Sequence, residues 1–196
     1  MTSLIFATNN ANKLAEVQHA FKNTLQIIGL KQAGIDVEIE EPYDTLEENA
    51  REKCRVIHQL TGYDCFGEDT GLEVAALSGA PGVKTARYAG EERSDTNNMQ
   101  LLLQNLLQVT NRSARFKTVI ALIWRGKDYL FEGICTGTIT VSPKGVQGFG
   151  YDPVFVPDGS VRTFAEMDMQ EKSKLSHRKK AMSKMVDFII NDRSNS

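Results

Sequence analysis

The order of helix and strand signals changes midway along the chain, and this change restricts the folds that the chain can adopt. The first part begins with an apolar run at residues 3–8 that predicts a buried strand, followed by Asn residues that can cap a helix. Between residues 115 and 141 the sequence instead predicts consecutive strands, with a hairpin turn at residues 125–128. Because helices and a hairpin both connect its strands, the chain is expected to form a mixed α/β sheet with flanking helices.

Composition narrows the class of protein further. The 196 residues suit one domain, which could have two lobes with a groove between them. The net charge of -2 gives no global attraction to nucleic acid or to an acidic membrane. The three cysteines fit neither a disulfide framework nor a zinc site. The sequence shows no signal-peptide pattern and no apolar run of the roughly 18 residues that suggest a membrane span, so we expect a cytoplasmic protein.

Three more helices are expected. Thr45 and Glu48 have the form of a capping box before a long helix, and Ser94 or Asp95 can cap another. An apolar stripe marks an amphipathic helix near the C-terminus, and its members are Leu175, Met182, Met185, Phe188 and Ile189.

A polar turn joins the first expected strand to the first expected helix. Its residues are Thr8, Asn9, Asn10, Ala11, Asn12 and Lys13. Backbone N–H groups at a helix N-terminus favour anions, so this turn could bind phosphate. An Asn-capped helix beside a solvated lysine would give the same pattern, and the Gly-Lys-Ser/Thr ending of a Walker A motif is absent.

Two adjacent acids, Glu68 and Asp69, stand between two glycines in the stretch FGEDTGLEV at residues 66–74. The flanks of this stretch are typical of a strand, and we interpret the glycines as a break in it. Paired carboxylates suit Mg²⁺ or a general base, and Glu40 with Glu41 could supply another metal ligand. The alternative is an exposed turn with two solvated acids.

Two clusters in the second half could bind a flat, charged ligand. In GFGYDP, at residues 148–153, an aromatic ring between glycines could stack on a planar ligand. A tight turn with two core aromatics would look the same. Ser176 can cap the last helix, which places His177 and Arg178 in a first turn whose dipole disfavours cations. A polyanion or the polar edge of a base would hold them, and a basic exposed face is the alternative.

Seven blocks of the sequence, in order, closely resemble the inosine triphosphate pyrophosphatases, which act on noncanonical purine nucleoside triphosphates. The blocks are FATNNANK, TLEENA, EDTGLEV, GAPGVKTARYAG, GFGYDPVF, TFAEM and EKSKLSHR. The resemblance implies hydrolysis of ITP, dITP and XTP to the monophosphate and pyrophosphate with Mg²⁺, which removes deaminated purines from the nucleotide pool. It also implies a homodimer and a single domain over residues 1–196, with an elongated twisted mixed sheet and two lobes around an active-site cleft.

The same resemblance assigns roles to individual residues. Asp69 would be the catalytic acid/base residue and a metal ligand, with Glu40 and Glu68 near the same metal. The turn Thr8–Lys13 would hold the phosphates, and Thr70 would touch the substrate. The residues around the base and the nucleotide would be Phe149, Gly150, Tyr151, Asp152, Lys172, His177 and Arg178, and the last two would read the base edge.

The expected reaction is in-line attack of water on the α-phosphorus, with Asp69 as base and Lys13 and Mg²⁺ neutralising charge. A donor from Arg178, His177 or a backbone N–H would favour the 6-keto group of inosine and xanthine over the 6-amino group of adenine. Arg178→Ala is accordingly expected to impair ITP use more than stability. The alternatives are a pyrophosphatase for modified pyrimidine nucleotides, a nucleotide-binding regulator without hydrolysis, and a single-stranded nucleic-acid binder, which the charge balance disfavours.

Overall fold

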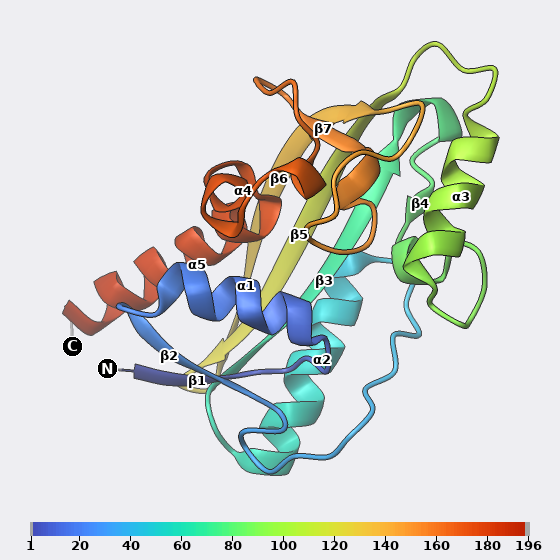
Figure 1. The fold of residues 1–196 in the computed structure, drawn as a ribbon. Helices are drawn as coiled ribbons and strands as arrows, with labels where there is room; N and C mark the ends of the chain where they lie inside the picture. Colours follow the sequence, from blue (N-terminus) through green and yellow to red (C-terminus); the bar gives the residue numbers. More distant parts are fainter. Residues whose placement is uncertain (1, 195–196) are drawn as a thin grey trace. The chain divides into compact units, whose positions relative to one another are not determined.

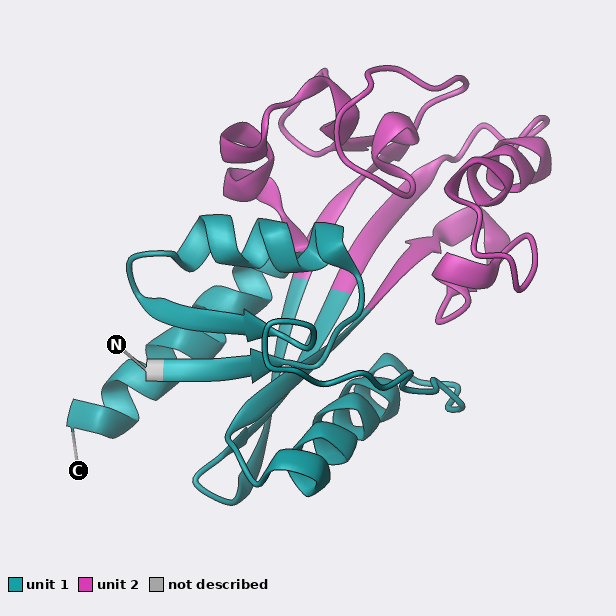
Figure 2. Cartoon of the chain, turned by 60° about the horizontal axis from the view of Figure 1, so that its bottom comes forward, with its two compact units in different colours: residues 1–69, 118–133, 178–196 teal, residues 70–117, 134–177 magenta. Residues whose placement is uncertain are grey.

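The structure, a computed structural model, describes residues 2–194 and has five α-helices and seven strands among them (Figure 1). The chain divides into two compact units (Figure 2). Of the described residues, 2–69, 118–133 and 178–194 form unit 1, and 70–117 and 134–177 form unit 2. Strands β3, β5 and β6 contribute residues to both units.

The seven strands belong to one mixed sheet. They are β1 (Thr2–Phe6), β2 (Leu25–Gly29), β3 (Cys65–Val74), β4 (Pro81–Gly82), β5 (Ser113–Trp124), β6 (Lys127–Ile139) and β7 (Phe155–Pro157). Their order is β2-β1-β3-β5-β6-β7, with β4 beside β3. β1 runs parallel to β2 and β3, whereas β4 is antiparallel to β3 and β7 is antiparallel to β6. The expected mixed sheet with flanking helices is therefore confirmed.

Unit 1 contains helices α1 (Ala11–Phe21) and α2 (Leu46–Thr61), together with α5 (His177–Ser194) from Arg178 onward. The side-chain oxygen of Asn10 caps α1 and accepts the backbone N–H groups of Asn12 and Lys13 at 3.0 and 3.1 Å. Thr45 caps α2 and accepts the backbone N–H of Glu48 at 3.2 Å. Both caps follow from the sequence, because Asn and Thr side chains satisfy N–H groups that the first helical turn leaves open.

The core of unit 1 lies between the sheet and helices α1 and α5. Its buried members are Leu4, Phe6, Val17, Phe21, Leu25, Ile27, Phe66, Ile120, Leu122, Trp124, Ala181, Met182, Met185, Val186 and Ile189. The expected stripe supplies three of these residues from α5, and Phe188 packs at the edge of the cluster. The expected place of Leu175 in the same helix is wrong: Leu175 ends α4 (Met169–Leu175), because the non-helical ψ of Ser176 (132°) interrupts the helix.

The hairpin between β5 and β6 turns on Arg125 and Gly126. Both residues have positive φ, 51° and 74°, which is the backbone of a two-residue type I′ turn. β6 begins at Lys127, so the turn occupies only the first half of the expected residues 125–128.

Unit 2 has its own core and shorter helices. These are α3 (Asp95–Asn105), which Ser94 caps, α4, and the 3-10 helices η1 (Ala75–Leu77), η2 (Thr85–Arg87), η3 (Asp152–Val154) and η4 (Phe164–Glu166). The buried cluster is formed by Leu72, Val74, Leu102, Leu106, Ala114, Phe116, Cys135, Ile139, Tyr151, Val154, Phe155, Phe164 and Met167. Each unit therefore buries a separate set of large apolar side chains, each of which contributes about 1.5–3 kcal/mol when fully buried.

Candidate active site

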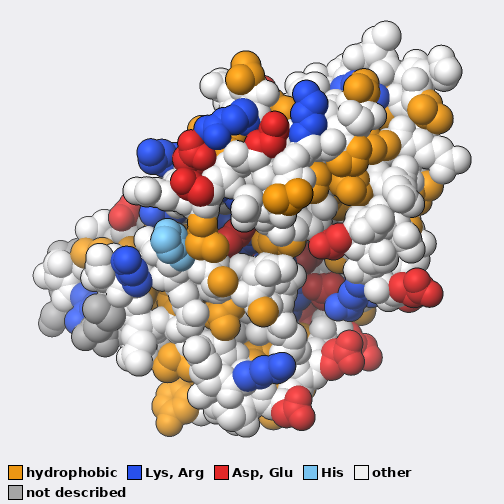
Figure 3. All heavy atoms as spheres, viewed as in Figure 1, with side chains coloured by type: hydrophobic (Ala, Val, Ile, Leu, Met, Phe, Trp, Pro, Cys, Tyr) orange, Lys and Arg blue, Asp and Glu red, His pale blue; other side chains and the backbone are white. Residues whose placement is uncertain are grey.

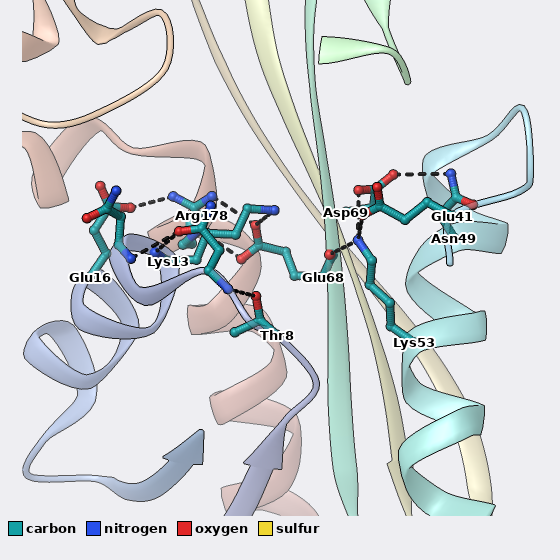
Figure 4. A network of polar contacts seen from close by, with 11 residues as sticks. Thr8, Lys13, Glu16, Glu41, Asn49, Lys53, Glu68, Asp69 and Arg178 are labelled. Carbon is teal, nitrogen blue, oxygen red and sulfur yellow. Dashed lines mark hydrogen bonds and ion pairs between the residues drawn. The ribbon is translucent and has the colours of Figure 1, made fainter. Parts of the chain in front are cut away.

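The two acids of β3 point to opposite faces of a continuous strand. The expected break at the glycines is wrong, because β3 runs without interruption from Cys65 to Val74. Successive side chains of a strand alternate between faces, so Glu68 points toward α1 and α5, and Asp69 points toward α2 (Figure 4). The two residues are 2% and 7% exposed, which rules out a solvated turn.

Gly67 allows α2 to approach the Asp69 face closely. A Cβ atom at this position would lie 2.4 Å from the backbone oxygen of Ala50 and 2.9 Å from the backbone nitrogen of Cys54, both on α2. Real Cβ atoms essentially never come so close, so only glycine permits this packing. The glycine before the two acids thus serves the helix contact that brings Lys53 to Asp69.

Asp69 lies in a small group of polar side chains on its face. The Lys53 ammonium is 3.0 Å from Asp69 Oδ1 and also contacts the Glu41 carboxylate, while it donates to the backbone oxygen of Glu68 at 2.9 Å. The side-chain amide of Asn49 donates to Asp69 Oδ2 at 3.4 Å. Two acids therefore share one cation here, and the group carries a surplus of negative charge.

The electrostatics of this group suit a proton acceptor. Burial raises the pKa of the Asp69 carboxyl above its usual range, and the charges of Lys53 and Lys13 oppose this rise. Burial alone would lower the pKa of Lys53, but Asp69 and Glu41 outweigh it, and the net shift is upward. Lys53 consequently stays protonated, and Asp69 is a stronger base than an exposed carboxylate.

Glu68 has a different environment, in which both of its oxygens face cations. The Arg178 guanidinium binds it through two hydrogen bonds of 2.8 Å, and Lys13 Nζ lies 3.2 Å from Oε1. Arg178 also pairs with Glu16 of α1. Burial lowers the pKa of Lys13, against the attraction of Glu68. Two acids face two cations in this group, so its charges balance.

The expected phosphate turn forms the start of α1. Thr8 Oγ1 accepts the backbone N–H of Asn10 at 3.1 Å, and the side chain of Asn9 donates to the backbone oxygen of Val37 at 2.8 Å. Residues 9–12 are exposed, whereas Lys13 is partly buried. The turn thus presents exposed backbone at a helix N-terminus, where the dipole favours an anion.

Unit 2 brings three of the expected base and nucleotide residues together. Lys172 Nζ lies 2.6 Å from Asp152 Oδ2 and 4.9 Å from the centroid of the Phe149 ring. The same Asp152 oxygen accepts the backbone N–H of Phe149 at 2.9 Å. Gly148 makes this turn possible: its φ is +76°, and a Cβ there would lie 2.0 Å from Asp152 Oδ2. The half-buried Phe149 ring is therefore held by a buried ion pair.

The remaining expected residues of unit 2 have individual positions. The buried Tyr151 donates its hydroxyl to the backbone oxygen of Thr85 at 2.9 Å, and burial raises its pKa. Gly150 donates its backbone N–H to Asp95 at 2.8 Å. The buried ring of His177 stacks on Phe116, with centroids 4.7 Å apart, and Thr70 is half-buried in β3. The alternative of a basic exposed face is wrong, because His177 and Arg178 are both buried.

The expected metal set of Asp69, Glu40 and Glu68 is not assembled. Within residues 2–194, no three His, Cys, Asp or Glu side chains form a group that could hold a metal ion. Glu40 is exposed, and Glu68 lies on the other face of β3 with two cations. Asp69 and Glu41 do fit Mg²⁺ in donor chemistry, because this ion commonly takes one or two carboxylates together with water and substrate phosphates.

Two residues of this group, Asn49 and Lys53, have no place in the sequence prediction, which named Glu41 only together with Glu40 as a possible metal ligand. A signal was present in α2, where Asn49 and Lys53 share the buried stripe with Leu46, Ala50, Cys54 and Ile57. Polar residues at the apolar positions of an amphipathic helix are rarely buried without a polar partner. The stripe therefore indicates that α2 faces a charged group.

The whole chain has well-defined relatives. A family model described as the Ham1 family matches residues 4–188. The dITP/XTP pyrophosphatase of Flavobacterium psychrophilum is 48% identical over 96% of this chain and 99% of that protein, and the one of Christiangramia forsetii is 46% identical over 95% and 98%. The structure of a HAM1 protein from Coxiella burnetii superposes with a TM-score of 0.87 at 36% identity and covers 97% of this chain and all of that one. Matches of this extent in sequence and in fold show that the chain belongs to the Ham1 family.

Proposed function

We propose that this protein hydrolyses noncanonical purine nucleoside triphosphates, namely ITP, dITP and XTP, to the monophosphate and pyrophosphate. The observation that carries this proposal is the buried Asp69 carboxylate, which shares the Lys53 ammonium with Glu41 and has a raised pKa. A buried base beside a surplus of negative charge suits metal-assisted attack of water on a phosphate. The names of the relatives support the substrate class.

In the proposed reaction Asp69 accepts a proton from water, and the water oxygen forms a bond to the α-phosphorus. The bond between this phosphorus and the oxygen that bridges to the β-phosphate breaks, and pyrophosphate leaves with the electron pair. The turn Thr8–Lys13 would hold the phosphates through backbone N–H groups and the charge of Lys13. Mg²⁺ bound by Asp69 and Glu41, with Glu40 as their neighbour, would neutralise phosphate charge.

Unit 2 would supply recognition of the base. The Phe149 ring, held by Asp152 and Lys172, offers a flat apolar surface on which a purine could stack. As the resemblance implies, Thr70 would touch the substrate. The base and the nucleotide would also be contacted by Gly150, Tyr151 and His177. For Arg178 the contacts with Glu68 and Glu16 support a first role in holding Glu68, and its expected reading of the base edge stays a prediction.

The setting of the enzyme is part of the same proposal. We place it in the cytoplasm as a homodimer in which residues 1–196 serve one catalytic domain, without a nucleic-acid or membrane partner. No helix within residues 2–194 is long and apolar enough to cross a membrane. On the face drawn in Figure 3, basic and acidic side chains are interspersed, whereas a nucleic-acid binder needs a basic groove.

The proposal is tested by pyrophosphate release from ITP, dITP, XTP, GTP and ATP, with Mg²⁺ and with EDTA. We expect fast, Mg²⁺-dependent release from the first three and slow release from GTP and ATP. Folded protein that releases pyrophosphate from none of them would overturn it. ITP binding without release would indicate a regulator, and release only from modified pyrimidine nucleotides would indicate the other pyrophosphatase class.

A further inference from the structure

Asn49 makes three hydrogen bonds that join one segment of unit 1 to Asp69. Its side-chain oxygen accepts the backbone N–H of Tyr43 at 3.0 Å, and its amide group donates to the backbone oxygen of Tyr43 at 3.0 Å. The same amide nitrogen also donates to Asp69 Oδ2, which lies 3.4 Å away. Asn49 is fully buried, so bulk water could not replace these hydrogen bonds if they were lost.

The hydrogen bonds that hold the backbone of Tyr43 also restrain Glu41, because only Pro42 separates the two residues. Pro42 has a ring that fixes its own φ, and it restricts the preceding residue, Glu41, to extended conformations. A segment with so little backbone freedom transmits the position of Tyr43 to the carboxylate two residues earlier. Glu41 then meets Lys53, which in turn contacts Asp69 (Figure 4).

We propose that Asn49 is a positioning residue for the hydrolysis, because it fixes the Glu41 segment and the Asp69 carboxylate in one arrangement. Without this amide, the two acids would lose their common geometry toward Lys53 and toward a cation. This inference rests on the proposed function. The inference goes beyond the proposed function, because it assigns a role to a side chain that needs no contact with the substrate.

Unit 2 contains a second buried Asn of the same kind, which serves as a matched control. Asn98 of α3 donates to the backbone oxygen of Ala86 at 2.9 Å and accepts the backbone N–H of Ala89 at 2.7 Å. It clamps a loop as Asn49 does, and it is 2% exposed. Neither of these two hydrogen bonds reaches an acid. Removing Asn98 should therefore cost stability in the way that removing Asn49 does, but without moving a carboxylate of the site.

The experiment compares Asn49→Ala with Asn98→Ala. Hydrogen exchange of residues 38–43 is measured first, because it does not depend on turnover. We expect exchange of the Tyr43 amide to accelerate at least about tenfold in Asn49→Ala and to stay unchanged in Asn98→Ala. Steady-state rates with ITP then give kcat, KM and the Mg²⁺ concentration for half-maximal rate.

For Asn49→Ala we expect kcat to fall about 10- to 100-fold and the half-maximal Mg²⁺ concentration to rise, with KM for ITP within about threefold. For Asn98→Ala we expect a similar loss of thermal stability, but kcat within about threefold of the parent. Equal kcat in the two variants, after correction for the folded fraction, would overturn the inference while the proposed function stands. A parent enzyme without turnover would overturn both.

If Asn49→Ala does not fold, Asn49→Asp provides the test. This variant keeps the shape of the side chain and the bond from the Tyr43 N–H, but it loses both donated bonds. We expect the Tyr43 amide to stay largely protected while kcat falls at least about tenfold. A folded Asn49→Asp with the parent kcat would contradict a positioning role.

Discussion

The two faces of β3 at Glu68 and Asp69 hold the same kinds of charged side chains in different proportions. On one face Glu68 and Glu16 meet Arg178 and Lys13, so that two acids balance two cations. On the other face Asp69 and Glu41 share the ammonium of Lys53. A balanced buried group holds its members in place, whereas a group with surplus negative charge can accept a further cation.

The contrast indicates that neighbouring acids in one strand have separate tasks. We assign Glu68 to the structure of the site, since both of its oxygens are bound by cations. We assign Asp69 to the chemistry, since its pKa is raised and it shares the Lys53 ammonium with a second acid. Variants of the two groups should therefore affect different properties.

The largest stability effect is expected for Arg178→Ala. Removing the guanidinium takes away the cation that binds both oxygens of the buried Glu68, while the ion pair with Lys13 stays. The loss of one partner of a buried ion pair costs about 3–5 kcal/mol in the free energy of unfolding. Urea denaturation would measure it. This reverses the expectation from the sequence that ITP use would suffer more than stability.

Arg162→Ala is a matched control for that change. Arg162 pairs with Glu171, and the two side chains are 49% and 40% exposed. An exposed pair of this kind contributes little to the free energy of unfolding, because water screens the two charges. If Arg178→Ala and Arg162→Ala have similar free energies of unfolding, the structural role that we assign to Glu68 and Arg178 is contradicted.

A smaller effect, on metal activation, is expected for Glu41→Gln. The amide keeps the size of the side chain but removes one of the two negative charges around Lys53. The Mg²⁺ concentration for half-maximal rate should rise about 10- to 100-fold. Glu40→Gln, at the exposed neighbouring position, should shift it far less. If Glu40→Gln raises this Mg²⁺ concentration more than Glu41→Gln does, Glu40 is the metal ligand, as the resemblance implies.

An effect on both packing and catalysis is expected for Gly67→Ala. The added methyl would meet the backbone oxygen of Ala50 at 2.4 Å and push α2, with Lys53, away from Asp69. Such overpacking costs about 1–3 kcal/mol, and thermal unfolding with ITP kinetics should show losses in both stability and kcat. Gly62→Ala, at the left-handed C-terminus of the same helix (φ 70°), should reduce stability without lowering kcat.

Much of this architecture could be predicted from local sequence signals. The caps at Asn10, Thr45 and Ser94 and most of the C-terminal stripe follow from residue types that satisfy or bury nearby groups. Ser176 was expected to begin a helix, but the sequence did not reveal that a separate helix, α4, ends there. Local preferences define where a helix can start more clearly than whether the preceding segment is also helical.

The division of labour between Glu68 and Asp69 could not be predicted in the same way. Two glycines suggested a break, and acids in a turn could converge on one metal ion. In the continuous strand, the alternation of side chains separates them. Gly67 is required by the helix that packs on it, and this tertiary contact between residues 50 and 67 has no local signature.

The most direct test of these separate tasks measures Asp69→Asn and Glu68→Gln side by side. ITP turnover per folded molecule and the free energy of unfolding are determined for both. We predict that Asp69→Asn lowers kcat about 10²- to 10⁴-fold with the smaller loss of stability. Glu68→Gln should destabilise the fold by about 3–5 kcal/mol, because two cations, the buried Arg178 and the partly buried Lys13, lose the carboxylate between them, and its folded fraction should retain the higher turnover. A stable but inactive Glu68→Gln beside an active Asp69→Asn would contradict the account.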